Sequence, residues 1–264
     1  MASRITTARS PGGRLLTIEA IDNLPSTAAL LERIAMRGGH DGYIVLSETS
    51  GHGEALKKRA NEKRLLVSIL LRPSLSPSRV AMFSVLGALA LARTVRRHSS
   101  LEPKIRWVGD LYADKQRIAE ATARGKLLPG GSGFRYVVVT LSLRLEGNFT
   151  ASLPEVVRSV FSPRRESPAE RISETLINEF FSLYEEMTAG ETAAFLDEYR
   201  DLSLLRGKRI RIAKDGRYLR ATVLGIDDDA GLVVAPRRGG STVLHSVSEL
   251  YDPRRSHKTA LTEK

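Results

Sequence analysis

The chain has 264 residues, no cysteine, and 41 Lys and Arg residues against 30 Asp and Glu, which gives a formal net charge of +11. Its length allows one large domain or a large domain with a small one, and its 42% hydrophobic content excludes a wholly disordered chain. The lack of cysteine excludes disulfides, zinc ribbons and thiol catalysis, and it fits a reducing compartment. The positive charge indicates a polyanionic partner such as nucleic acid, an acidic protein or a nucleotide. A general compositional bias toward arginine would explain it equally.

The sequence predicts neither a secretory signal nor a membrane span. Residues 1–13 contain arginines but no apolar stretch behind them. The longest apolar run, from Val80 to Ala92, is closed by Arg79 and Arg93. A span needs about 20 residues, so this shorter run predicts a buried core helix. We therefore expect no membrane association and, by default, a cytoplasmic protein.

The first part of the chain alternates between strands and helices. Leu15–Ile21 has the alternation of a strand, and Ser26 stands where it can cap a helix over Thr27–Arg37. The elements predicted next are a short strand at Tyr43–Leu46, a polar loop over 47–61, a central strand at Leu65–Leu71 and the core helix at Arg79–Arg97.

More strands are predicted beyond the core helix. Lys104–Trp107 favours a short strand followed by a loop over Val108–Asp110, and Arg117–Arg124 fits a strand or a helix equally. The glycines at 130–133 predict a hairpin tip, and Tyr136–Leu145 has strong β-propensity.

The residue pattern changes near Leu204, from helices to short strands. Before it, Pro168–Ala189 and Glu191–Tyr199 predict amphipathic helices. After it, four short strands with tight turns are predicted, at Gly207–Ala213, Tyr218–Asp227, Gly231–Pro236 and Ser241–His245. We therefore expect a mixed α+β domain over 1–203, a small β-barrel over 204–251 and a disordered tail over 252–264.

The order of elements and several motifs resemble the biotin–protein ligases. Ser26 and Thr27, in the segment Leu-Pro-Ser-Thr, resemble that family's helix entry beside the biotin pocket. The stretch 106–112, Arg-Trp-Val-Gly-Asp-Leu-Tyr, resembles its Lys-Trp-Pro-Asn-Asp-Leu segment, and 204–210 resembles the opening of its C-terminal barrel. The resemblance implies an α+β fold with a class II synthetase-like mixed sheet and flanking helices, followed by an SH3-like barrel. Too few residues precede the first strand for the DNA-binding module that some members carry, so no DNA-repressor role is implied.

The resemblance also implies a two-step reaction. Biotin and ATP give biotinyl-AMP and pyrophosphate, usually with Mg²⁺, and a lysine of a biotin carrier domain then takes the biotinyl group. Such a site holds two anions together and neutralises charge on phosphate. The catalytic residues implied are Arg117, Asp110 and Arg106. Those implied for ligand binding are Ser26, Thr27, Gly51, His52, Gly53 and Trp107. The histidines of the sequence show no metal-ligand spacing, so we expect no metal site of their own.

Three departures from the family pattern bear on activity. At Gly51, His52 and Gly53 the family's phosphate loop keeps its glycines but loses every arginine, and an acidic residue, Glu54, follows. The neighbouring Lys57, Lys58 and Arg59 could supply that charge or could simply be a solvated face.

The other two departures are on predicted strands. Arg117 replaces a lysine that meets biotin's carboxylate and the phosphate in the family, and Glu120 replaces a glycine beside it. On the strand Tyr136–Leu145, Thr140, Ser142 and Arg144 occupy the positions of Gly-x-Gly-x-Asn, so side chains fill space next to the ligand.

Two interpretations follow. The first is an ATP-dependent biotin–protein ligase with substituted loops. The second is a catalytically weak or inactive homologue that acts as a binding or regulatory subunit, as a homodimer or paired with an active ligase. The SH3-like end disfavours a lipoate-type acyl ligase, and the lack of an aromatic–basic ladder disfavours nucleic acid as the partner.

Overall fold

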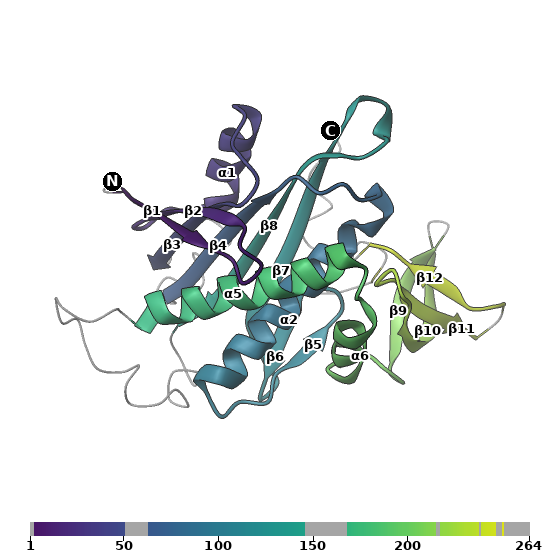
Figure 1. Ribbon diagram of the computed structural model, residues 1–264. Helices are drawn as coiled ribbons and strands as arrows, with labels where there is room; N and C mark the ends of the chain where they lie inside the picture. Colours follow the sequence, from purple (N-terminus) through teal and green to yellow (C-terminus); the bar gives the residue numbers. More distant parts are fainter. Residues whose placement is uncertain are drawn as a thin grey trace, which may run out of the picture.

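The computed structural model describes residues 3–50, 63–145, 168–214, 217–237, 239–246 and 250. In this part of the chain the fold is mixed α+β, with an eight-stranded sheet and a separate four-stranded antiparallel sheet (Figure 1). The predicted fold class is thus confirmed at the level of a large mixed sheet with flanking helices, followed by a small β unit. The SH3-like form of that unit and the exact domain boundaries stay predictions.

The large sheet has the strand order β1-β2-β3-β4-β8-β7-β6-β5. Only β2 and β3 pair in parallel; every other neighbouring pair is antiparallel. The strands are β1 Ser3–Arg9, β2 Leu15–Ile21, β3 Tyr43–Ser50, β4 Lys63–Leu71, β5 Lys104–Arg106, β6 Asp110–Ala113, β7 Gln116–Leu127 and β8 Phe134–Arg144.

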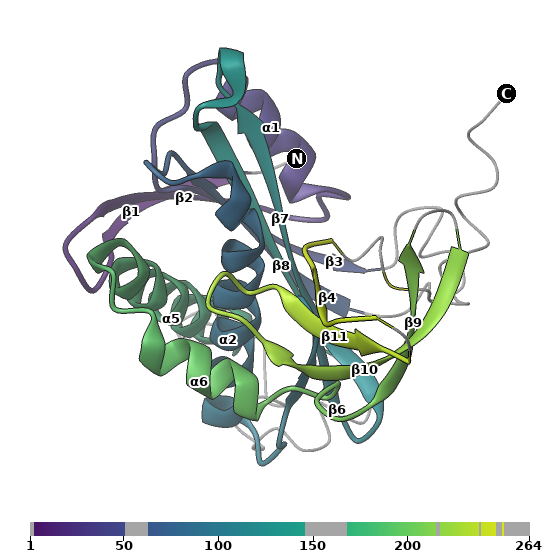
Figure 2. The ribbon, with the colours of Figure 1, turned by 90° about the vertical axis from the view of Figure 1, so that its right-hand side faces the viewer.

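Helices cover the two faces of this sheet unequally (Figure 2). On one face α2, Val80–His98, lies against β6, β7 and β8, and α5, Pro168–Ala189, packs along α2. The short helix α6, Ala193–Asp201, continues that layer. On the other face α1, Thr27–Met36, packs mainly on β3, β4 and β8. The remainder of that face, over β4, β8, β7 and β6, carries no described helix.

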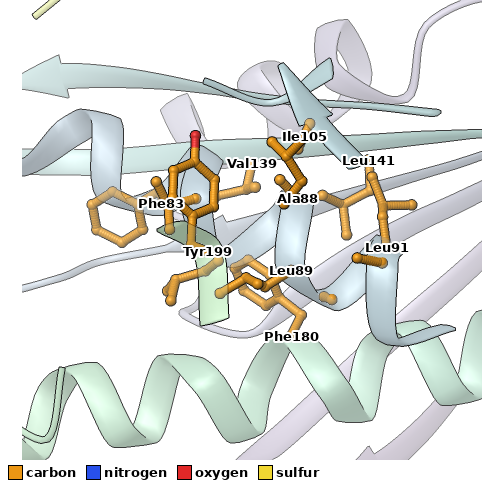
Figure 3. Close-up of a cluster of buried hydrophobic side chains, with 14 of the residues drawn as sticks. Phe83, Ala88, Leu89, Leu91, Ile105, Val139, Leu141, Phe180 and Tyr199 are labelled. Carbon is orange, nitrogen blue, oxygen red and sulfur yellow. The ribbon is translucent and has the colours of Figure 1, made fainter. Parts of the chain in front are cut away.

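Helix α2 forms the centre of the core (Figure 3). Nearly all its residues from Met82 to Val95 are buried, including Phe83 and Leu89, and the aromatic ring of Phe180 from α5 closes over them. A Cβ at Gly87 would lie 2.6 Å from Leu141 Cδ2 and 2.8 Å from Ala121 Cβ. The glycine therefore lets the helix axis approach β7 and β8 closely. The helix has the length and hydropathy of a membrane span, but 72% of the relevant window is buried inside the protein. The core helix predicted over Arg79–Arg97 is confirmed.

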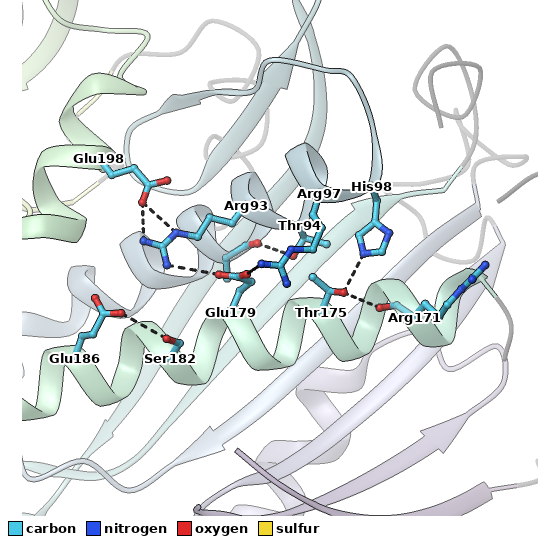
Figure 4. A network of polar contacts seen from close by, with 11 residues as sticks. Arg93, Thr94, Arg97, His98, Arg171, Thr175, Glu179, Ser182, Glu186 and Glu198 are labelled. Atoms are coloured by element: carbon cyan, nitrogen blue, oxygen red, sulfur yellow. Dashed lines mark hydrogen bonds and ion pairs between the residues drawn. The ribbon is translucent and has the colours of Figure 1, made fainter. Parts of the chain in front are cut away.

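A network of ion pairs joins α2 to α5 and α6 at the rim of this core (Figure 4). Arg93 donates to Glu198 Oε2 from Nε at 3.0 Å and from Nη2 at 2.7 Å, and it also pairs with Glu179 at 3.5 Å. Arg97 contacts Glu179 at 2.9 Å. Because two-nitrogen contacts to one carboxylate are geometrically demanding, this network fixes the positions of the three helices relative to each other.

The strand β8 shows how the sheet separates its two faces. Val139 and Leu141 lie in the main core with α2, whereas Val138 lies in a second cluster under α1. Thr140 and Ser142, which alternate with the core residues, therefore lie on the α1 side beyond the end of that helix. We call this uncovered part of the α1 side the open face. It consists of 64, 66 and 68 of β4, 140, 142 and 144 of β8, 117, 120 and 122 of β7, and 110 of β6.

The small sheet packs against the edge of the large one. Its order is β12-β11-β10-β9, with bounds β9 Arg209–Lys214, β10 Arg217–Ile226, β11 Leu232–Pro236 and β12 Thr242–Leu244. Its buried side chains, among them Ile212 and Leu232, belong to the same core cluster as α2. The backbone of Ile105 in β5 bonds Leu202 and Leu204 at 2.8 Å each, which joins the linker before β9 to the large sheet.

The predicted elements differ from the observed ones mainly at strands. Helix α5 has the predicted bounds, and the ambiguous segment Arg117–Arg124 is a strand. Strand β3 continues to Ser50 into the predicted loop, because it pairs residue by residue with β4. Strand β1 was not predicted, since all its residues are exposed and show no alternation. Asp110, the first residue of strand β6, was predicted to end a loop, and the other three residues were given no element; pairing with β5 and β7 makes all four a strand.

One titratable group in the helix layer gives a prediction about stability. Burial, with the nearby charges of Arg97 and Arg171, lowers the pKa of His98 below its ordinary value. Thr175 donates its own proton to the Arg171 carbonyl at 3.0 Å, so it accepts the 2.9 Å hydrogen bond from His98 Nε2. The folded state therefore favours neutral His98, whereas the unfolded state binds a proton below about pH 6.5.

We expect the free energy of unfolding to fall as the pH drops below about 6.5 because of this group. His98→Gln, which keeps a donor for Thr175 but cannot titrate, should show a shallower fall between pH 7 and pH 5. The measurement is urea unfolding at several pH values for both proteins. Equal slopes of stability against pH in the two would contradict this role.

Candidate functional site

Three separate segments meet on the open face. They are the start of α1, the strands β6 and β7, and the second half of β8. Helix α1 begins where Ser26 accepts a 3.2 Å hydrogen bond from the backbone N–H of Ala29, so Ser26 is its N-cap, as predicted. The Ser26 hydroxyl is thus engaged in holding the helix start, and the next residue, Thr27, is turned toward the sheet and is 1% exposed.

A row of hydroxyl groups crosses the open face from α1 toward β7. Thr27 Oγ1 lies 2.7 Å from Ser68 Oγ on β4, and Ser68 Oγ lies 3.0 Å from Thr140 Oγ1 on β8. Thr122 of β7 is the strand partner of Thr140. Thr27 and Ser68 are buried, Thr140 is half-buried, and Thr122 is exposed. The row therefore leads from the protein interior out to the surface of the sheet.

A cluster of charges stands at the β6–β7 end of the open face. Arg117 Nη1 donates to Asp110 Oδ1 at 3.0 Å and lies 3.2 Å from Glu120 Oε2. The two carboxylates and one guanidinium carry a net charge of −1. Burial alone would lower the pKa of Arg117, but the charges of Glu120 and Asp110 and the bond to Asp110 raise it above its ordinary value. Arg117 is a permanent cation that is already paired with two anions.

The segment Trp107–Asp110 is held from three directions. The indole N–H of Trp107 donates to Ala230 O of the small sheet at 2.8 Å, and the hydroxyl of Tyr199 on α6 donates to Val108 O at 2.8 Å. Burial raises the pKa of Tyr199, so this donor stays neutral. Ala121 N–H donates to Gly109 O at 2.8 Å. These bonds fix the backbone that presents Asp110 to Arg117.

A cleft of about 250 Å³ lies beside this segment, between the large sheet and the small one. Val80 and Ala81 at the start of α2 form one wall, and Ala121 of β7 and Trp107 form another. Asp110 and Glu120 line its polar side, and His245, just after β12, closes it from the small sheet. The cleft therefore opens directly onto the charge cluster.

The structure brings several of the predicted site residues together. Asp110 and Arg117 lie on the open face, and Thr27 lies beside it at the start of α1. Arg106, at the end of β5, is the strand partner of Asp110 and is half-buried. Trp107 is buried, and its indole N–H is used by Ala230. Gly51, His52 and Gly53 lie outside the described residues, as do Lys57, Lys58 and Arg59. The roles assigned to all these residues stay predictions.

Sequence reasoning missed Ser68 of the open face and the contact that Arg64 makes there. Ser68 links Thr27 to Thr140, and Arg64 donates from Nη1 to Ser142 Oγ at 3.0 Å. Both lie on β4, where they alternate with the core residues Leu65, Val67 and Ile69. The signal that could have found them is this alternation of polar residues within an apolar strand.

The comparisons with known proteins give a fold but no sequence relative: no protein-family model and no curated protein matches the chain. A biotin protein ligase-like protein of unknown function from Silicibacter sp. TM1040 has a TM-score of 0.66 at 17% identity, over 90% of this chain and 96% of that one. The biotin protein ligase of Aquifex aeolicus has a TM-score of 0.64 at 11% identity, over 89% and 96%.

This chain has the biotin protein ligase fold. The structure of the Aquifex aeolicus enzyme in complex with biotin and ATP has a TM-score of 0.63 at 11% identity, and the match covers 89% of this chain and 97% of that one. The match extends over the large sheet and the small sheet together, so the resemblance inferred from motifs is confirmed at the level of structure. At these identities the biotin protein ligase fold is shared, whereas the site residues have to be judged from this chain alone.

Gly109 provides a test of how tightly the site segment is packed. A Cβ at this position would overlap the carbonyl oxygen of Ala121, so we expect Gly109→Ala to push the segment away from β7. Overpacking of this kind costs about 1–3 kcal/mol. The measurement is chemical unfolding, and Gly225→Ala is the control, because a Cβ there meets nothing within 4 Å. An unchanged stability of Gly109→Ala would show that the segment can move.

Proposed function

We propose that this protein is a carboxylate-activating ligase of the biotin protein ligase type. In the first step an acid, with biotin as the reference, attacks the α-phosphate of ATP through its carboxylate oxygen and pyrophosphate leaves. In the second step the amine of an acceptor lysine attacks the acyl carbon and AMP leaves. One observation carries the proposal: on a biotin protein ligase fold, Asp110 and Arg117 lie beside a cleft on a face of the sheet that no described helix covers, and the hydroxyl row from Thr27 leads onto the same face.

The side chains of the open face have distinct roles in this proposal. Arg117 would neutralise charge that grows on the phosphate, and Asp110 keeps its guanidinium oriented through the 3.0 Å bond. Arg106 would add positive charge at the end of β5. The cleft beside Trp107 would take the nucleoside, and the row that starts at Thr27 would hold the acid. No covalent enzyme intermediate is needed, because both nucleophiles belong to the substrates.

A magnesium ion would supply further neutralisation of the triphosphate. Carboxylates together with substrate phosphates are the usual ligands of Mg²⁺. Asp110, which lines the cleft, fits that chemistry and would hold the ion. In the described part of the chain no group of three or more His, Asp or Glu residues forms a ready metal site, so the phosphates would complete the ligand set.

The expected protein partner is a carrier domain that presents the acceptor lysine. The pairing of β6 with β7 ends at Glu120, so from Thr122 to Leu127 the outer edge of β7 pairs with no described strand. Such an edge can receive a strand from another protein or from a second copy of this chain. An antiparallel bridge between Ile212 and Leu250 supports an SH3-like closure of the small sheet. The lack of cysteine supports a cytoplasmic location.

A second function is favoured by one specific contact. Glu120 lies 3.2 Å from Arg117, the cation that the reaction needs. Its carboxylate neutralises positive charge that would otherwise be available to a phosphate. A binding or regulatory subunit with weak or no catalysis would tolerate this arrangement. The two functions differ in whether an acyl-adenylate binds at all and in whether it is turned over.

Calorimetric titration with a non-hydrolysable biotinyl-adenylate mimic in the presence of Mg²⁺ tests the proposal. We expect binding with a dissociation constant between nanomolar and low micromolar, followed by transfer to a carrier-domain lysine when biotin and ATP are supplied. Binding without transfer would support the regulatory subunit. No heat of binding and no shift of the melting temperature would contradict an adenylate site.

Two variants connect that binding to the charge cluster. Arg117→Ala should weaken binding of the mimic by roughly 10- to 100-fold, because a hydrogen bond to a charged group is lost. Glu120→Gln should strengthen it by about tenfold, because the negative charge beside the ligand is removed. Arg9→Ala and Glu174→Gln, which make the same changes at exposed sites on β1 and α5, serve as controls. Affinities that stay equal in all four variants would remove Arg117 from the site.

A further inference from the structure

The open face is lined almost entirely by polar side chains, and this composition bears on which acid the protein accepts. Its second row runs across four strands as Leu66, Ser142, Glu120 and Asp110. Together with the hydroxyl row of Thr27, Ser68, Thr140 and Thr122, this leaves Leu66 as the one apolar side chain in the two rows of the open face. An apolar acyl chain placed here would strip water from hydroxyl and charged groups without bonding them.

Within the linked part of the hydroxyl row, which is Thr27, Ser68 and Thr140, a ligand can bond at one place. Three linked hydroxyls contain three protons, and the two contacts between Thr27, Ser68 and Thr140 use two of them. Thr27 and Ser68 are buried, so the half-buried Thr140 is the end that a ligand can reach. If Thr140 donates to Ser68, its lone pairs can accept from a ligand; if it accepts from Ser68, its proton can be donated. A hydroxyl or amide group can meet either arrangement.

A further buried hydroxyl on the same side of the sheet adds to this. Thr49 lies on the opposite face of β3 from Leu46, which packs against the main core. Its strand partner is Arg64 of the open face. Thr49 is 4% exposed, and among the described residues its Oγ1 has no hydrogen-bond partner. Unsatisfied buried hydroxyls are rare in native proteins, so this one also indicates a surface arranged for polar groups.

The charge cluster supplies the other anchor. Asp110 accepts its hydrogen bond from Arg117 Nη1, and the 3.2 Å contact of Glu120 is also with Nη1, so an acid would approach the guanidinium from its Nη2 and Nε side. Ser142 is level with Glu120, and Thr140 lies two residues farther along β8. Two residues of a strand span roughly 7 Å. An acid held at Arg117 therefore reaches Thr140 with a group about four or five atoms beyond its carboxylate.

We propose that the acid recognised by this face is a short polar carboxylic acid of about four to six carbons, with a hydroxyl or amide group that bonds Thr140. This inference rests on the proposed function, since it concerns the acyl half of the same adenylate site. Thr140 is the residue that distinguishes such an acid from an apolar one.

The test uses three acyl-sulfamoyl adenosines, which are non-hydrolysable adenylate mimics with the same nucleoside and different acyl groups. The acyl groups are 5-hydroxypentanoyl, pentanoyl and biotinyl, and affinities are measured by calorimetry on the full chain. We expect the 5-hydroxypentanoyl compound to bind at least tenfold more tightly than either of the others. Equal or tighter binding of the pentanoyl or biotinyl compound would overturn the inference and leave the proposed function standing. If none of the three binds, the proposed function itself fails.

Variants at Thr140 assign the preference to its hydroxyl. Thr140→Val keeps the shape of the side chain and should abolish the difference between the 5-hydroxypentanoyl and pentanoyl compounds, while Thr140→Ser should keep it. Thr7→Val, the same change on the exposed strand β1, is the control and should retain the full difference. If Thr140→Val keeps the wild-type ratio, Thr140 does not recognise the acid. Melting curves of each variant establish that it is folded.

Discussion

The burial of α2 against the sheet is the constraint on which the rest of the structure depends. Gly87 brings the helix close to Leu141 and Ala121, and the aromatic residues of α5 complete its enclosure. Because one face of β8 and of the first half of β7 is used for this packing, every second residue there lies on the opposite face. The polar residues Thr140, Ser142 and Glu120 can therefore gather there without weakening the core. The polar site can form on the open face because α2 packs on the opposite face of the sheet.

Connections to the small sheet extend the same principle. Tyr199 of α6 and Ala230 of β10–β11 both bond the segment that ends in Asp110. The ion pairs of Arg93 hold α6 in place, so a contact far from the open face contributes to the position of a site residue. A site on a flat sheet surface would otherwise depend on a loop of few contacts. Here the loop is held by three separate layers, which suits a surface that has to keep charged groups in fixed positions.

Helices and central strands could be predicted from the sequence. The apolar residues of α5 recur with the helical period, and β8 has strong β-propensity. Strand β1 could not, since its exposed residues carry no period and only pairing with β2 makes it a strand. For the site, Asp110, Arg117 and Thr27 were named from motifs; the first two lie on the open face, and Thr27 lies beside it. Ser68 was not named, because a serine within an apolar strand is informative only when the face that it occupies is known. The pairing of Glu120 with Arg117 depends likewise on the irregular register of β6 and β7.

The sequence contains a single tryptophan, and the structure places it at the wall of the cleft with its indole N–H bonded to the small sheet. All of the indole fluorescence of this protein therefore comes from one environment. A ligand that enters the cleft would change the polarity around the ring, and separation of the two sheets would break its hydrogen bond and admit water. The emission maximum of the unmodified protein thus reports occupancy of the cleft and contact between the two sheets, with no attached dye.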